Sequence, residues 1–233
     1  MKKLSELSLF LPAYNEEKVI TQTITKSDAI LRKVAKKYEI LVVNDGSTDK
    51  TEEVVNKVIK KNPNVRMITH NPNKGYGGAL KTGLYESKYK YIAFIDADGQ
   101  FDFSEIGKFI EHIDNFDLVI GYRAKRADTG LRIATAYLLK LWNMFWFRFS
   151  VKDTDCGFKL IKKDVVDRLP KLKTESAITE TEFLIRAQRA GYKFKEVPVY
   201  HYPRTTGKST GGDPRVIFRA AKETLQLWWA LKS

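Results

Sequence analysis

Cysteine and long apolar runs are what this 233-residue sequence lacks most clearly. Cys156 is its one cysteine. A single thiol cannot form an internal disulfide, so we expect an intracellular protein. No apolar run approaches the roughly 20 residues that span a bilayer, and the start, MKKLSELSLFLPAYNEE, has polar interruptions and no cleavage site. Internal repeats and linkers are also missing, so we expect one domain over residues 1–233 that does not cross a membrane by itself.

Acidic residues are outnumbered, with 28 Asp and Glu against 41 Lys and Arg and a net charge of +13. Such an excess favours an anionic partner, which can be a nucleic acid, an anionic membrane or a phosphorylated substrate, although solubility alone also explains it. The basic residues do not form one block, and no aromatic–basic nucleic-acid motif accompanies them. We therefore expect no nucleic-acid partner.

Strand and helix patterns alternate through the first half of the chain. Short apolar runs predict strands at residues 7–11, 39–43, 65–69, 91–95 and 118–120, and helical spacing predicts helices at 17–38, 51–61, 78–87 and 103–113. This alternation predicts an α/β fold with a mainly parallel central sheet. Ligands of such sheets bind at the carboxyl ends of the strands. Polar residues recur at those ends, notably Asp45 and Asp96.

Two carboxylates follow the strand expected at residues 91–95, in the stretch YIAFIDADGQF. Asp96 and Asp98 repel each other unless a cation lies between them, and their hard oxygen atoms suit Mg²⁺ or Mn²⁺. Gln100 offers a third oxygen. A solvated turn is the alternative, since Asp-Gly pairs favour turns. The presence of Asp45 at the same sheet edge favours the metal site.

Two glycine-rich stretches also invite a phosphate site. NKGYGGALKTG at 73–83 could bring backbone N–H groups to a phosphate at a helix start, or it could be a flexible turn. Its glycine spacing is not that of the dinucleotide fingerprint. TGKSTGG at 206–212 is not a phosphate-binding P-loop, because Tyr202 occupies the position of the required first glycine.

In this order along the chain, the motifs resemble those of family 2 glycosyltransferases of the GT-A type. The matching stretches are PAYNEE (12–17), NDGSTD (44–49), NKGYGGALKTG (73–83), DADGQ (96–100), GYR (121–123), DTDCGFK (153–159) and HYPRTTGKS (201–209). The subgroup they resemble most comprises the dolichyl- or polyprenyl-phosphate mannose or glucose synthases. These enzymes move a hexose from GDP-mannose or a UDP-hexose to a lipid phosphate. One departure is Gly99, where the lipid-phosphate enzymes usually carry Leu.

The resemblance implies a Rossmann-like three-layer sandwich and assigns roles to residues by position. It divides the chain into a donor half, residues 1–123, and an acceptor half, residues 124–233. The implied nucleotide-sugar ligands are Pro12, Tyr14, Glu16, Asp45, Asp96 and Ala97. The implied metal ligands are Asp96, Asp98 and Gln100, for Mg²⁺ or Mn²⁺. The implied catalytic residues are Asp153, Arg123 and Arg204, and the candidate acceptor-binding residues are Arg126, Arg132 and Lys208.

The nature of the acceptor decides which of these groups the reaction needs. A sugar hydroxyl needs a general base, and Asp153 or Asp155 could supply it. A lipid phosphate is already anionic and needs cations, for which Arg is well suited. Arg126, Arg132 and Lys208 could equally be solvated surface residues, and Asp153 or Asp155 could simply position Lys159 or Arg123. By family position, the resemblance implies a single-displacement, inverting transfer.

All four tryptophans fall in two segments that could contact a membrane. The spacing of apolar residues predicts amphipathic helices at 131–149 and about 214–231. Their aromatic and basic residues are typical of helices at a membrane interface. Packing against the domain or docking on a small membrane subunit are the alternatives. Glu180 and Glu182 open another expected helix, where acids suit the N-terminus without a catalytic role. Cys156 has no nearby His motif and is expected to be a buried thiol.

The leading hypothesis is thus a peripheral glycosyltransferase on the cytoplasmic face of a membrane, with a nucleotide-hexose donor and a polyprenyl-phosphate acceptor. One rival is a family 2 transferase with a glycan or other hydroxyl acceptor and Asp153 as general base. A rival of another class is a non-catalytic nucleotide-sugar or nucleic-acid binding protein, whose nucleic-acid form would show salt-sensitive oligonucleotide binding without sugar transfer.

Overall fold

The computed structural model describes the whole chain except residues 1, 126–140, 143, 177, 205–213 and 233. Its strands are β1 (Leu4–Ala13), β2 (Ala35–Asn44), β3 (Val65–Thr69), β4 (Tyr91–Ile95), β5 (Leu118–Lys125), β6 (Phe158–Lys162) and β7 (Phe194–Tyr200). Its helices are α1 (Ile20–Val34), α2 (Thr51–Ile59), α3 (Gly75–Glu86), the 3-10 turn η1 (Phe103–Glu105), α4 (Ile106–Ile110), α6 (Lys163–Arg168), α7 (Ile178–Arg189) and α8 (Pro214–Lys232).

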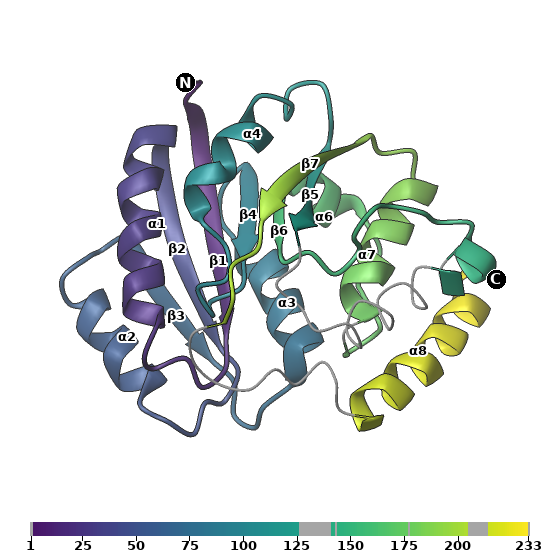
Figure 1. Ribbon diagram of the computed structural model, residues 1–233, viewed down its shortest axis with the longest axis horizontal. Coiled ribbons are helices and arrows are strands. Elements are labelled where there is room, and N and C mark those ends of the chain that lie inside the picture. Colours follow the sequence, from purple (N-terminus) through teal and green to yellow (C-terminus); the bar gives the residue numbers. More distant parts are fainter. Residues whose placement is uncertain (1, 126–140, 143, 177, 205–213, 233) are drawn as a thin grey trace.

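The described strands form one seven-stranded sheet with the order β3-β2-β1-β4-β6-β5-β7. Every neighbouring pair is parallel except the two pairs made by β6, which runs antiparallel to β4 and β5. The mainly parallel α/β fold predicted from the sequence is confirmed. Because helices cover both faces of the sheet, the central strands are buried along most of their length (Figure 1).

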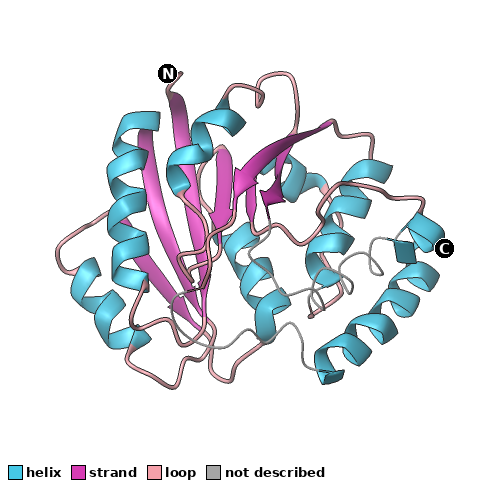
Figure 2. Ribbon diagram, in the orientation of Figure 1, coloured by secondary structure: helices cyan, strands magenta, loops and turns pink. Residues whose placement is uncertain are grey.

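Two apolar cores lie on opposite faces of the sheet and give the molecule three layers. On one face the strands pack against α1, α2, η1 and α4, through residues such as Ile24, Val55 and Phe109. On the other face they pack against α3, α6, α7 and α8, through residues such as Leu80 and Leu227. The helices that flank the sheet are seen in Figure 2. The expected three-layer sandwich is therefore present.

Some predicted boundaries were wrong, and strand pairing explains the largest error. The helix expected at 17–38 is α1, which ends at Val34. Residues 35–38 instead begin β2, because the pairing of β1 with β2 starts at Leu4 and Ala35. Pairing with a neighbouring strand outweighed the helical spacing of this segment. The strands at 65–69 and 91–95 were predicted with the observed limits.

The helices expected at the membrane are described only in part. The C-terminal helix is α8. Within residues 131–149, the described positions 141–142 and 144–147 are helical. Arg126, Arg132 and Lys208, the candidate acceptor-binding residues, lie outside the described residues. Within the described part of the chain, no helix combines the length and apolarity needed to cross a membrane.

Candidate active site

The carboxyl ends of β1, β2 and β4 form one edge of the sheet, and backbone hydrogen bonds join them there. The amide of Asp45 donates to the carbonyl of Ala13, and the amide of Ala97 donates to the carbonyl of Pro12. The hydroxyl of Thr23 also donates to the carbonyl of Ala97. These bonds hold the segments that carry Asp45, Asp96 and Asp98 side by side, as the topology predicted.

Asp45 is buried and is held by groups that follow β3. Its Oδ1 accepts from the amide of Lys74 at 2.8 Å and lies 2.7 Å from Nδ1 of His70. The other ring nitrogen of His70 is 2.9 Å from the hydroxyl of Thr82 on α3. This chain of contacts fixes the orientation of the carboxylate. His70 follows directly after the run expected as a strand at 65–69, which puts it at this sheet edge from the sequence alone, but no role was assigned to it there.

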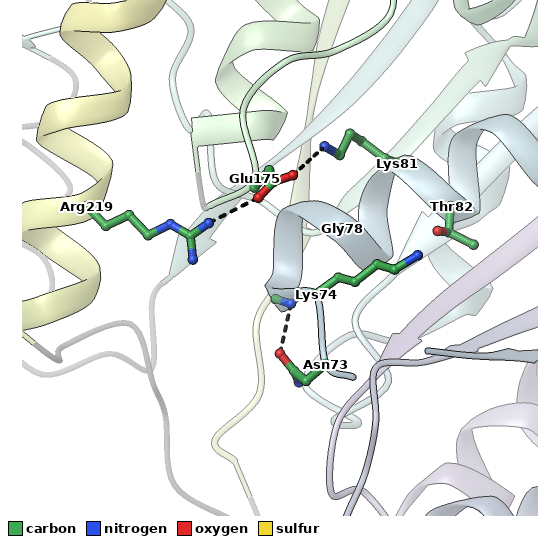
Figure 3. A pocket seen from close by; sticks show the side chains of 8 residues that line it. Asn73, Lys74, Gly78, Lys81, Thr82, Glu175 and Arg219 are labelled. Carbon is green, nitrogen blue, oxygen red and sulfur yellow. Dashed lines mark hydrogen bonds and ion pairs between the residues drawn. The ribbon is translucent and has the colours of Figure 1, made fainter. Parts of the chain in front are cut away.

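A cavity of about 560 Å³ opens beside the 73–75 segment, whose Asn73 side chain and Lys74 amide contact Asp45 (Figure 3). It is lined by Asn73, Lys74, Gly75, Gly78, Lys81, Thr82, Glu175 and Arg219. Glu175 lies 3.8 Å from the ammonium of Lys81 on α3 and 3.5 Å from the guanidinium of Arg219 on α8. The cavity is therefore mostly polar, with an excess of positive charge near the end of β2.

Asp96 lies between two segments from different parts of the chain. Its Oδ1 accepts a 3.3 Å hydrogen bond from the hydroxyl of Tyr76 in the first turn of α3. Its Oδ2 lies against Gly157, where an added Cβ would approach within 2.3 Å. Only glycine permits this approach of the 153–157 loop. Burial and the charge of Asp98 raise the pKa of Asp96 to about 7.

The residues around this carboxylate fit a divalent cation. Burial raises the pKa of Glu16 to about 7; Arg204 opposes this rise, and the charge of Asp98 adds to it. The contribution of Asp98 reflects repulsion between carboxylates at this edge. The guanidinium of Arg204 pairs with Glu16 and lies 3.7 Å from Asp98, so positive charge is stabilised here. Among the residues that the structure describes, no three Asp, Glu, His or Cys side chains form a metal group. Two carboxylates, an amide oxygen and substrate phosphates are ligands that Mg²⁺ commonly takes.

Gln100 and Arg204 belong to segments that are joined to each other. The Nε2 of Gln100 donates to the carbonyl of Tyr202 at 2.9 Å, and the amide of Tyr202 donates to the carbonyl of Gln100. Because Nε2 of Gln100 is used in this contact, the side-chain oxygen of Gln100 is the atom that could face a cation. The segment carrying Arg204 is thereby fixed beside the two Asp residues, which lie about a hundred positions earlier in the sequence.

Arg123 on β5 and Asp153 form a buried, forked ion pair. The Nε and Nη2 atoms of Arg123 donate to the two carboxylate oxygens of Asp153 at 2.7 and 2.8 Å, and the amide of Arg123 donates to Oδ2. The side chains are 7% and 4% exposed. Asp153 therefore positions Arg123, one of the two roles that the sequence analysis left open.

A second buried ion pair lies below this loop. The ammonium of Lys159 contacts Glu180 and donates to the carbonyls of Thr154 and Cys156. Burial lowers the pKa of Lys159 to about 8 and raises that of the Cys156 thiol to about 12. The expectation that Cys156 is a buried thiol is confirmed. The reading of Glu180 as a simple helix N-terminal charge was incomplete, because it is buried and pairs with a lysine from β6.

Glu182, the other acid assigned to the helix terminus, is also buried. Its carboxylate accepts from the amides of Lys173 and Thr174, from the Thr174 hydroxyl and from Arg186. It shapes the loop before α7. Of the remaining donor residues, Tyr14 is exposed at the end of β1, whereas Pro12 and Ala97 contribute backbone contacts. Tyr76 and Gly157 were also missed, because their importance depends on contacts between distant segments.

A three-layer, mainly parallel α/β domain with this carboxylate edge defines a GT-A glycosyltransferase fold. The model of glycosyl transferase family 2 matches residues 8–169, so the chain belongs to that family.

Two curated relatives are dolichyl-phosphate beta-glucosyltransferases. The protein from Dictyostelium discoideum is 33% identical over 214 residues, covering 83% of this chain and 65% of its own length. The protein from Saccharomyces cerevisiae is 32% identical over 219 residues, covering 83% of this chain and 66% of its own length. The chain thus spans about two-thirds of the length of these relatives.

Among solved structures, glucosyl-3-phosphoglycerate synthase from Mycobacterium tuberculosis, in complex with Mn²⁺, UDP and glucosyl-3-phosphoglycerate, superposes with a TM-score of 0.75. The match covers 96% of this chain and 80% of the synthase, at 18% identity. At that identity, the similarity establishes the fold.

Proposed function

We propose that the chain transfers glucose from UDP-glucose to a dolichyl or other polyprenyl phosphate at a membrane surface. Family membership supports hexosyl transfer from a nucleotide sugar. The names of the relatives favour glucose and a lipid phosphate, and the bound UDP of a structural neighbour favours a uridine donor over GDP-mannose.

The observation that carries the choice of acceptor is the forked contact between Arg123 and Asp153. Both oxygens of Asp153 accept from the guanidinium, so the carboxylate is poorly suited to take a proton from an acceptor hydroxyl. A phosphate acceptor needs no base, because its oxygen is already anionic. It needs fixed positive charge, which Arg123 and Arg204 can provide. This favours a lipid phosphate over a glycan hydroxyl.

The donor would lie along the carboxyl edge of the sheet. Asp45 has a second oxygen for the base, next to the polar cavity, and Tyr14 and Glu16 flank the path toward Asp96. Asp96, Asp98 and Gln100 would hold Mg²⁺ or Mn²⁺, which supplies Lewis-acid stabilisation of the leaving diphosphate. Arg204 would exchange its carboxylate partners for the donor's phosphates, and this adds charge stabilisation in the transition state.

The transfer itself balances without a proton. An acceptor phosphate oxygen attacks the anomeric carbon on the face opposite the diphosphate, the carbon–oxygen bond to UDP breaks, and UDP leaves with the electron pair. UDP-glucose is an α-glycoside, so attack from the opposite face gives the β-linked product for which the relatives are named. Arg123 would hold the attacking phosphate.

The membrane contact is proposed for an aromatic patch that consists of Trp142, Phe145, Trp146, Trp228 and Trp229. The ring centroids of Trp146 and Trp228 are 4.8 Å apart, so the segment at 141–147 and α8 meet there. Phe145 and Trp229 are 77% and 70% exposed. Exposed aromatic side chains on a basic protein favour an anionic bilayer interface. The cytoplasmic face of the membrane is part of the proposal, since nucleotide sugars and an intracellular chain would meet there.

The proposal is tested by transfer from labelled UDP-glucose and GDP-mannose to a short polyprenyl phosphate, with Mn²⁺, Mg²⁺ or EDTA. We expect metal-dependent label in the organic phase from UDP-glucose alone. Label from GDP-mannose would contradict the donor assignment, and label that stays on a water-soluble product would contradict the acceptor. Asp153→Asn should slow lipid-phosphate transfer without shifting its pH profile, whereas loss of a titration would indicate a base.

A further inference from the structure

Tyr76 belongs to the glycine-rich stretch at 73–83, but the sequence analysis assigned it no role. It lies in the first turn of α3, and its hydroxyl donates to Oδ1 of Asp96 at 3.3 Å. Its ring is 37% exposed and borders the same edge of the sheet. Tyr76, from the glycine-rich segment at 73–83, therefore contacts Asp96, a proposed metal ligand in the DADGQ segment.

The start of α3 is fixed on both sides, so Tyr76 has little freedom to move away from Asp96. On one side the amide of Lys74 donates to Asp45, and the Asn73 side chain contacts the Asp45 carbonyl. On the other side an added Cβ on Gly77 would approach Thr179 within 2.2 Å and the Glu175 backbone within 2.5 Å. The helix start is thus pressed against the loop before α7.

The two oxygens of Asp96 therefore meet different neighbours. Oδ1 accepts from Tyr76, and Oδ2 lies against Gly157. A carboxylate oxygen has more than one acceptor direction, so the Tyr76 contact leaves room for a cation while restricting rotation of the carboxylate. Hydrogen bonds of this kind to a metal ligand orient it, and removing them weakens metal binding.

We propose that Tyr76 is a positioning residue that orients Asp96 for the divalent cation and the donor diphosphate. The inference rests on the proposed function, since it takes a metal–UDP complex as the ligand of this edge. The start of α3 then joins the two ends of the proposed site. Lys74 contacts Asp45 at the nucleoside end, and Tyr76 contacts Asp96 at the metal end. A change at Tyr76 should therefore act on metal and donor binding before it acts on the chemical step.

The test compares Tyr76→Phe with Tyr85→Phe, which removes a phenol hydroxyl from the same helix. The Tyr85 hydroxyl accepts from the amide of Leu172, away from the carboxylates. Mn²⁺ binding in the presence of UDP is measured by electron paramagnetic resonance, alongside thermal unfolding and the KM for UDP-glucose. We expect Tyr76→Phe to weaken Mn²⁺–UDP binding about five- to tenfold and to raise KM similarly, with kcat at saturation nearly kept.

Three outcomes would overturn the inference, and they separate it from the proposed function. Unchanged Mn²⁺–UDP affinity in Tyr76→Phe would remove the positioning role while the proposed function stands. An equal loss in Tyr85→Phe would mean that α3 is weakened in general, and the specific role would be lost. A parent protein that binds neither Mn²⁺ nor UDP would refute the proposed donor site and the positioning role together.

Discussion

Residues 1–123 carry their site residues at the ends of parallel strands, whereas residues 124–233 carry them on loops held by contacts with distant segments. In residues 1–123, Asp45 and Asp96 each follow directly on a buried strand. In residues 124–233, Asp153 is held in the forked pair with Arg123, and Arg204 pairs with Glu16, a contact that joins positions 188 residues apart. Site geometry is thus locally encoded in one half and depends on tertiary packing in the other.

This difference predicts that function and stability separate in residues 1–123 and are linked in residues 124–233. A carboxylate at the sheet edge supports little of the core, so its loss should affect the reaction and spare the fold. A buried charge beneath the 153–157 loop supports both the core and the loop. Substitutions that compare the two halves therefore test the contrast directly.

Asp98→Ala should have the largest effect on the reaction. Removing one of the two carboxylates proposed to hold the metal should lower kcat/KM for UDP-glucose about a thousandfold, because a bound cation is worth several kcal/mol in the transition state. The free energy of unfolding should change little, since the side chain lies at the sheet edge, where it accepts from the amide of Gln100 and forms a long, 3.7 Å ion pair with Arg204. Transfer kinetics and urea unfolding measure the two quantities.

The matched control for this substitution is Asp102→Ala. Asp102 follows the same motif, and its side chain accepts from the amide of Ser104 at the start of η1. It should retain most of the activity and the metal response. If Asp98→Ala kept full Mn²⁺-dependent turnover, the assignment of the metal to this edge would be wrong.

Lys159→Met should have the largest effect on stability. It leaves Glu180 buried without its cation and removes the ammonium that donates to the carbonyls of Thr154 and Cys156. Breaking a buried pair by removing one partner costs about 3–5 kcal/mol. Activity should fall as well, because the loop that carries Asp153 and Gly157 loses its support. Urea unfolding and transfer kinetics at a temperature where the variant is folded would measure both effects.

The double variant Lys159→Met/Glu180→Leu isolates the cause. Replacing both partners removes the uncompensated charge, so much of the lost stability should return. Lys57→Met on α2, which breaks the exposed pair with Glu53, is the surface control and should leave unfolding nearly unchanged. Equal destabilisation by Lys159→Met and Lys57→Met would contradict the contrast between the two halves.

The same contrast explains how much could be predicted from the sequence. Apolar runs and the acids behind them identified β3 and β4 with their observed limits and gathered Asp45, Asp96 and Asp98 at one edge. The pattern failed at Ala35, where pairing with β1 extends β2 backwards into helical spacing. It also could not find the roles of Tyr76 and Gly157 or the partner of Glu180, because each depends on a side chain from another element.

The smallest expected effect on stability and on donor binding is that of changes in the aromatic patch. Phe145 and Trp229 are largely exposed, so Phe145→Ser with Trp229→Ser should leave unfolding and Mn²⁺–UDP binding close to the parent. Partition into phosphatidylcholine–phosphatidylglycerol vesicles should drop about tenfold or more, since each aromatic side chain contributes more than about 1 kcal/mol when it leaves water.

Tyr200→Ser is the control, because Tyr200 is a 58% exposed aromatic residue outside the patch. It should bind vesicles like the parent, and the patch variant should use a short, soluble polyprenyl phosphate better than a long one in vesicles. An equal loss of vesicle binding in both variants would mean that general surface apolarity, rather than the junction of the 141–147 segment with α8, carries the membrane contact. Unchanged partition of the patch variant would leave the basic charge as the sole source of binding, and raising the salt concentration would then abolish it.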